Sequence, residues 1–189
     1  MKPTAFNVFS GRGGLILTGR NGWIASIVVM AVLLSGCNRR TTPSHPINPC
    51  TYEAYHYCVT VTRVSDGDSF RGLTEDGEEH RFRIYGIDAP EGNQPYGPEA
   101  GNFLRNLIDG HTVGIVQHTT DRWGRRVVWV FTPNGEDVSA LLLQEGLAWH
   151  YKHFDDTPEY ATYENEARFH RKGLWQDPYP TPPWEFRRR

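Results

Sequence analysis

The sequence predicts an α+β fold that is mainly β: a five-stranded Greek-key barrel of the OB type with three helices. Five short segments in the middle of the chain have strand patterns, one helical pattern follows the third of them, and two more follow the fifth. A small barrel suits short strands because closing the sheet removes its edges. The chain has 189 residues, of which 38% are hydrophobic, so it is long enough for one such domain and short for two.

Alternation of apolar and polar residues marks the strands. The first two are separated by the turn Asp66-Gly67-Asp68, and the second and third by the hairpin sequence Glu-Asp-Gly-Glu. The predicted strands are residues 58–64, 69–73, 80–85, 112–116 and 127–131.

Helical spacing of apolar residues marks three further segments. In the first, Phe103, Leu104, Leu107 and Ile108 share one side and Gly110 ends the pattern. The predicted helices are residues 98–108, 137–145 and a last one from Thr157 or Pro158 to Gly173.

The first 37 residues have the layout of an export signal. They hold three basic residues and no acidic one, then an apolar run over residues 23–34. That run is short for a ~30 Å hydrocarbon core, which needs about 20 apolar residues. Its ending, Leu-Ser-Gly-Cys, resembles a bacterial lipobox, in which Cys37 becomes the acylated first residue of the mature chain.

We therefore expect residues 1–37 to be a lipoprotein-type signal segment that is cleaved just before Cys37, and the protein to be lipid-anchored in the cell envelope through Cys37. Asn38 after this cysteine favours the outer membrane over the inner one. Two alternatives stay open: an uncleaved membrane anchor, and ordinary cleavage that gives a soluble periplasmic or secreted protein. We divide the remainder into a tether (38–52), a domain (53–176) and a Pro-rich, basic tail without regular structure (177–189), which its aromatic residues could pin to the domain.

Charge limits the partners of the mature chain. Without residues 1–37 it keeps 17 of the 20 basic residues and all 22 acidic ones, a net charge of −5 with neutral histidines. Overall charge therefore does not attract a polyanion, and any attraction must be local or carried by a bound cation. This argues against a passive nucleic-acid coat protein.

Two cysteines remain once Cys37 is set aside. Cys50 and Cys58 form an even pair in a chain that we expect to be exported, which predicts a disulfide that closes a short loop. Two free thiols are the alternative.

Acidic and basic residues gather around the predicted turn and the end of the third strand. Asp68, Asp88 and Glu91 could converge on one hard cation, since oxygen ligands suit Ca²⁺ or Mg²⁺. Arg83 and Arg125 would supply planar donors for phosphate oxygens. A held metal, an activated water and stabilised phosphoryl charge are what phosphodiester hydrolysis requires.

Four segments that carry these residues resemble the staphylococcal nuclease (thermonuclease) family, in the family's order, and the resemblance extends over roughly residues 60–176. It points to a bacterial lipoprotein or secreted member. The segments are residues 64–70 (Val-Ser-Asp-Gly-Asp-Ser-Phe), 82–91 (Phe-Arg-Ile-Tyr-Gly-Ile-Asp-Ala-Pro-Glu), 96–100 (Tyr-Gly-Pro-Glu-Ala) and 121–125 (Asp-Arg-Trp-Gly-Arg).

The resemblance implies a single Ca²⁺ ion bound by the carboxylates of Asp68 and Asp88 and by the backbone carbonyl of Ala89. The family usually has Thr at the position of Ala89, which a carbonyl ligand tolerates. Asp66 would not bind the metal itself but would support the residues that do.

The resemblance also implies the catalytic roles. Glu91 would activate or position the attacking water, and Arg83 and Arg125 would hold the scissile phosphate. The reaction would be hydrolysis of DNA or RNA to 3′-phosphorylated products, by an endonuclease.

The candidates for stacking on unpaired substrate bases are Trp123, Tyr151 and Phe154. The alternative for each is a packing residue of the core or of the surface. Lys152 is a candidate for a phosphate contact, whereas we interpret His150 and His153 as solvated surface histidines.

Taken together, the sequence predicts a monomeric calcium-dependent nuclease that acts on nucleic acid and has no protein partner. The alternative is a non-catalytic OB-type envelope protein that binds nucleic acid. The presence of all five polar side chains of the site favours the enzyme.

Overall fold

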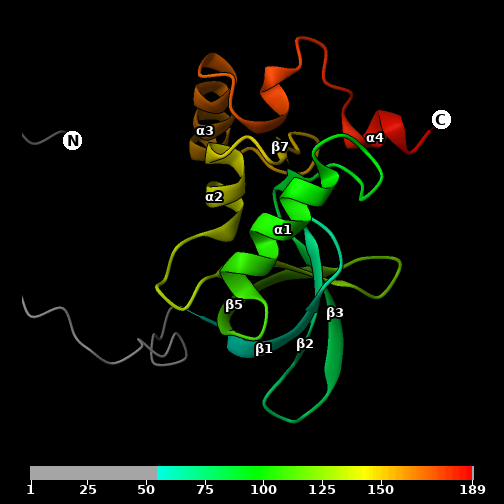
Figure 1. The fold of residues 1–189 in the computed structure, drawn as a ribbon. Coiled ribbons are helices and arrows are strands. Elements are labelled where there is room, and N and C mark those ends of the chain that lie inside the picture. Colours follow the sequence, from blue (N-terminus) through cyan, green and yellow to red (C-terminus); the bar gives the residue numbers. More distant parts are fainter. Residues whose placement is uncertain (1–54, 189) are drawn as a thin grey trace, which may run out of the picture. The chain divides into compact units, whose positions relative to one another are not determined.

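The computed structural model describes residues 55–188, so the predicted signal segment, the tether and Cys50 lie outside the described residues. Within them, five strands close into a barrel (Figure 1), which confirms the predicted fold. The barrel strands are β1 (Tyr57–Val64), β2 (Ser69–Leu73), β3 (Glu79–Ile84), β5 (Thr112–Thr120) and β6 (Arg126–Phe131).

The barrel runs in the order β1-β2-β3-β6-β5 and closes through β1 and β5. All pairs are antiparallel except β3 and β6, which are parallel with Arg83 opposite Val127. This parallel pair brings the end of the third strand beside the start of the last one. Inward residues of every strand fill the barrel, and the largest of them, Phe70 and Phe82, stack with ring centroids 4.9 Å apart.

Three helices pack outside the barrel: α1 (Gly97–Ile108), α2 (Val138–Gln144) and α3 (Pro158–Phe169). Leu104 and Ile108 of α1 are completely buried, as the predicted helical spacing requires. Figure 1 shows α2 and α3 side by side. None of the helices within residues 55–188 is long and apolar enough to cross a membrane.

Several boundaries differ from the prediction. Strand β5 continues to Thr120 because it stays paired with β6 along that length. Helix α3 ends at Phe169 and not at Gly173, since Arg171 has a φ of 51°. The short strands β4 (Ile87–Asp88) and β7 (Trp149–His150) pair with each other and were not predicted.

The prediction of a tail without regular structure is wrong for residues Pro183–Phe186, which form the short helix α4. Aromatic packing explains the difference. Trp184 lies 5.5 Å from the ring of Trp149 and stacks on Tyr151 at the same centroid distance, with an interplanar angle of 9°. The tail therefore packs against the β7 region.

Asp137 is the cap of helix α2. One of its carboxylate oxygens accepts a hydrogen bond from the backbone N–H of Ser139 at 2.8 Å, and the other accepts from the hydroxyl of Tyr160 at 2.5 Å. The cap thus joins α2 to α3, and burial raises the pKa of Asp137 despite these hydrogen bonds.

Replacing this cap should destabilise the fold. Asp137→Ala is expected to lower the free energy of unfolding by about 1–2 kcal/mol, because a helix cap is lost and a buried tyrosine hydroxyl loses its acceptor. Urea denaturation measures the change, with the exposed Asp156→Ala as the control. Equal midpoints for the two variants would contradict the role given to Asp137.

Candidate active site

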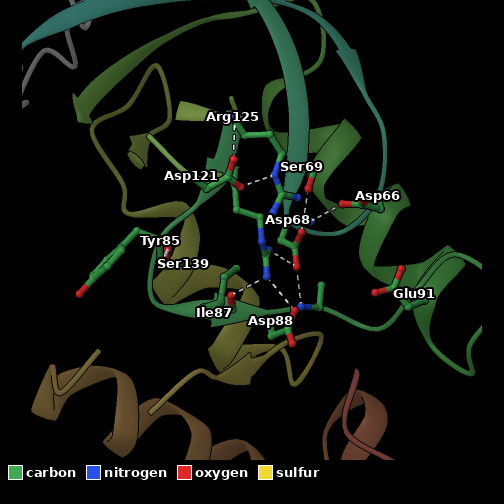
Figure 2. A network of polar contacts seen from close by, with 12 residues as sticks. Asp66, Asp68, Ser69, Tyr85, Ile87, Asp88, Glu91, Asp121, Arg125 and Ser139 are labelled. Atoms are coloured by element: carbon green, nitrogen blue, oxygen red, sulfur yellow. Dashed lines mark hydrogen bonds and ion pairs between the residues drawn. The ribbon is translucent and has the colours of Figure 1, made fainter. Parts of the chain in front are cut away.

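Arg83 joins the two carboxylates that the sequence singled out. Asp68 precedes β2, Asp88 lies in β4, and the guanidinium of Arg83 on β3 reaches both: Nη1 contacts Asp68, and Nη2 lies 2.7 Å from Asp88 Oδ1. The side chain of Asp88 is only 1% exposed and that of Arg83 13% exposed. The predicted site residues from these three elements therefore meet in one place (Figure 2).

Asp68 is held in a fixed orientation by neighbouring donors. The backbone N–H of Ala89 donates to its Oδ2 at 2.7 Å, and the hydroxyl of Ser69 donates to its Oδ1 at 3.0 Å. Asp66 Oδ1 accepts from the backbone N–H of Asp68 at 3.1 Å. This arrangement fixes the carboxylate before any ligand arrives.

The turn that carries Asp68 lies close to β4 and α1 because it contains Gly67. A Cβ atom at this position would lie 2.7 Å from the Cβ atoms of both Ala89 and Ala100. Glycine is therefore needed to let the turn approach the segment that holds Asp88.

Glu91 stands on the loop after β4, and two residues that sequence reasoning missed hold this loop. The side-chain oxygen of Gln94 accepts a hydrogen bond from the backbone N–H of Glu91 at 3.2 Å, and the backbone N–H of Gln94 donates to the Glu91 carbonyl at 2.8 Å. Gly97 makes a close approach, since a Cβ there would lie 1.8 Å from the same carbonyl oxygen. The carboxylate of Glu91 remains 35% exposed.

Arg125 comes from the turn before β6. Its Nε lies 2.7 Å from Asp121 Oδ2, and the other carboxylate oxygen of Asp121 accepts from the backbone N–H of Arg125 at 2.9 Å. Because β6 runs parallel to β3, Arg125 lies on the same side of the barrel as the carboxylates, as Figure 2 shows. Asp121 was not predicted as a functional residue, although it opens the Asp-Arg-Trp-Gly-Arg segment.

A third arginine reaches the site from the C-terminal tail. Arg187 Nη2 lies 2.7 Å from Asp88 Oδ2, and Arg187 Nη1 lies 2.7 Å from Glu91 Oε1. Sequence reasoning treated this residue as part of a basic tail. The aromatic residues just before it were the available signal that the tail packs on the domain.

The charges in this network shift one another's proton affinities. Burial raises the pKa of Asp88 even though Arg187 and Arg83 act against it. Burial opposes the charge of Arg83, but Asp68 and Asp88 outweigh it and raise the pKa of the guanidinium. Burial and then the charge of Asp68 raise the pKa of Asp66 to about 6.

The residues predicted to contact substrate have different surroundings. Trp123 is 56% exposed, and the guanidinium carbons of Arg122 and Arg125 lie 4.2 Å and 5.2 Å from its ring centroid. Tyr151 is partly exposed, and the ring of Trp184 from the tail stacks on it. The ammonium of Lys152 forms an ion pair at 2.5 Å with the buried carboxylate of Glu164 on α3.

The interpretation of His150 as a solvated surface residue is wrong. His150 is 4% exposed, and its Nε2 lies 2.7 Å from the buried carboxylate of Asp155. The pairing of β7 with β4 places it inside the domain. His153 is exposed, as predicted.

The donor chemistry of the site suits a hard cation. Asp68, Asp88 and the carbonyl of Ala89 offer only oxygen, which is the ligand type that Ca²⁺ prefers. Among residues 55–188, the one group of three acidic or histidine residues with ligand atoms within 4.8 Å of one another lies elsewhere, on the exposed β2–β3 hairpin. That group is Asp76, Glu78 and His80.

Fold and site together define an OB-type α+β domain with carboxylates and arginines gathered at one side of its barrel. The family model described as "Staphylococcal nuclease homologue" matches residues 81–177. The chain belongs to the staphylococcal nuclease family.

Individual relatives agree with this assignment. The chain is 36% identical over 129 residues to a protein of Escherichia coli named "Uncharacterized endonuclease", a match that covers 68% of this chain and 84% of the relative. It is 36% identical over 139 residues to "Micrococcal nuclease" of Shigella flexneri, covering 68% and 79%. It is 41% identical over 120 residues to "Staphylococcal-like nuclease CAN1" of Arabidopsis thaliana, covering 64% of this chain but only 37% of that longer protein.

The raised pKa of Asp66 predicts a pH dependence of stability when metal is removed. Its pKa in the folded protein is about 6, above the ordinary value of 3.8, so the folded state binds this proton more tightly than the unfolded state. The stabilisation of the folded state by this proton is fully present below the ordinary pKa of 3.8 and is lost as the pH rises through about 6. Asp66→Asn should remove that part of the decline, measured by urea denaturation of the metal-free protein between these pH values.

The exposed Asp109→Asn is the matched control for this measurement. If both variants follow the wild-type pH profile, the raised pKa of Asp66 is refuted.

Proposed function

We propose that this protein is a calcium-dependent nuclease that hydrolyses DNA or RNA to 3′-phosphorylated products. One observation carries the proposal: Arg83 bridges two buried carboxylates, Asp68 and Asp88, beside Arg125 and Glu91. Family membership and the names of the relatives support phosphodiester hydrolysis as the reaction.

The proposed metal ligands are Asp68, Asp88 and the carbonyl of Ala89. When bound there, Ca²⁺ would supply positive charge to a phosphate oxygen and to water. The burial of Asp88 favours this use, because a cation offsets the cost of keeping a carboxylate charged away from water.

Glu91 is the proposed water-directing group. Its carboxylate is partly exposed and stands on a loop that is fixed by Gln94, so it can accept a proton or a hydrogen bond from water without a large movement. Asp88, in contrast, is too enclosed to reach bulk water.

Arg83 and Arg125 are the proposed phosphate ligands. Asp121 orients Arg125 through its Nε and leaves the two terminal nitrogens for phosphate oxygens. Positive charge fixed in advance stabilises the charge that develops on phosphorus during attack. Trp123, exposed next to Arg125, is the proposed stacking surface for an unpaired base.

This assignment predicts a metal-dependent activity with specific losses. Hydrolysis of denatured DNA should require Ca²⁺ and stop in EGTA. Glu91→Gln should lower kcat by about 10²–10⁴-fold, because the water is no longer directed, and Arg125→Ala by about 10²–10³-fold. Initial rates measured with saturating Ca²⁺ test both values.

Matched controls are available on the surface. Glu99→Gln and Arg63→Ala make the same chemical changes at exposed positions and should leave the rate unaltered. Activity that survives EGTA, or a kcat that is undiminished in either site variant, refutes the mechanism. Equal activity with Mg²⁺ in place of Ca²⁺ refutes the metal assignment.

We also propose that the protein is exported and anchored by acylation of Cys37, with a disulfide between Cys50 and Cys58. The support is the sequence of the first 37 residues and the pair of remaining cysteines. In such a location, the substrate is nucleic acid outside the cytoplasm.

Anchoring can be tested through detergent partitioning of the protein expressed in a Gram-negative host. The wild-type protein should follow the membrane fraction and the detergent phase, and Cys37→Ser should leave both, since the lipid is lost. Cys50→Ser changes the same residue type without touching the lipidation position and should stay with the membrane. Membrane association of Cys37→Ser would argue for an uncleaved anchor instead.

A further inference from the structure

The C-terminal residues 181–188, here called the C-terminal strap, lie directly against the candidate active site. Arg187 makes three hydrogen bonds to its carboxylates: Nη2 to Asp88 Oδ2 at 2.7 Å, Nη1 to Asp88 Oδ1 at 3.2 Å and Nη1 to Glu91 Oε1 at 2.7 Å. One guanidinium from the end of the chain therefore holds both oxygens of Asp88 and one of Glu91.

The strap is anchored by contacts that are independent of Arg187. The ring of Trp184 stacks on Tyr151 and meets Trp149 edge to face. At the start of the strap, the carbonyl of Thr181 accepts a hydrogen bond from the side-chain amide of Gln94 at 2.6 Å. Figure 1 shows α4 at the same end of the domain as β7. These anchors bring Arg187 to the carboxylates in a defined position.

Arg187 uses the same atoms that a cation would need. Asp88 Oδ1 accepts hydrogen bonds from both Arg83 and Arg187. Asp88 Oδ2 accepts one from Arg187, and within residues 55–188 no other donor to this oxygen is described. Because the Asp88 side chain is only 1% exposed, a cation cannot approach it from a free solvent side while the guanidinium is in place. A cation would add a third positive group to the two guanidinium groups that Asp88 already binds, and these positive charges would repel one another.

We infer that the C-terminal strap is an autoinhibitory element in which Arg187 competes with Ca²⁺ for the carboxylate of Asp88. This inference rests on the proposed metal site. Cation binding requires the strap to move away from Asp88, and the strap in turn lowers the apparent affinity of the site for Ca²⁺. The same contact holds Glu91, so the closed strap withdraws the water-directing carboxylate together with the metal ligand.

The strap is built to open without unfolding the domain. It contains only one helical turn, α4, and the Arg187 side chain is 42% exposed, so water screens its ion pairs. Its contacts with the domain include those to the β4 and β7 regions and to the loop between β4 and α1.

Calorimetric titration of the full-length protein with CaCl₂, without substrate, tests the competition. If the strap is closed in about nine molecules of ten, Arg187→Ala should bind Ca²⁺ about tenfold more tightly, because the competent fraction rises towards one. Trp184→Ala should shift the affinity in the same direction, although it keeps the charge of Arg187 and removes only an anchor.

Arg188→Ala is the matched control, since it removes the same charge one residue later and Arg188 makes no ion pair with a described carboxylate. Its Ca²⁺ affinity should equal that of the wild type. Circular dichroism confirms that each variant is folded.

The outcomes separate the inference from the function on which it rests. Equal Ca²⁺ affinity of wild type and Arg187→Ala overturns the autoinhibitory strap and leaves the nuclease intact. Equal tightening by Arg187→Ala and Arg188→Ala also overturns it, because net charge would then explain the change. Absence of Ca²⁺ binding in every protein overturns both the metal assignment and the strap.

Discussion

The bridge from Arg83 to Asp68 and Asp88 is the interaction on which the rest of the site depends. It spans three elements, the turn before β2, the strand β3 and the short strand β4, and it neutralises two carboxylates that burial would otherwise disfavour. Removing the arginine would leave buried negative charges together, which costs several kcal/mol. The close approach at Gly67 and the hydrogen bond from Ala89 serve the same arrangement.

Local patterns predicted the barrel and the three helices well because strands such as β1 and helices such as α1 are long enough to show a period. They could not predict β4 and β7, since two residues have no periodicity and pair only through the tertiary fold. The same reason explains His150: its burial is set by β7 and by Asp155, neither of which the local sequence reveals.

The candidate residues Asp68, Arg83 and Asp88 could be predicted because they stand in short motifs within one part of the chain. Gln94 and Arg187 were missed for a physical reason. Gln94 holds the loop by hydrogen bonds to the backbone of Glu91, and nothing in the sequence distinguishes it from a loop glutamine that makes no such bonds. Arg187 contacts Asp88, which lies 99 positions earlier in the sequence. A single sequence contains no signal for a contact of that kind beyond the aromatic residues of the tail.

Asp88 is held by two arginines that differ in how firmly they are attached to the protein. Arg83 belongs to a strand inside a closed barrel, whose hydrogen bonds open only when the domain unfolds, whereas Arg187 belongs to a terminal turn that can fray locally. The two halves of this ion-pair network therefore have very different lifetimes. Amide hydrogen exchange at Ile84 would follow unfolding of the whole domain, and exchange at Arg187 would follow local opening of the C-terminal turn.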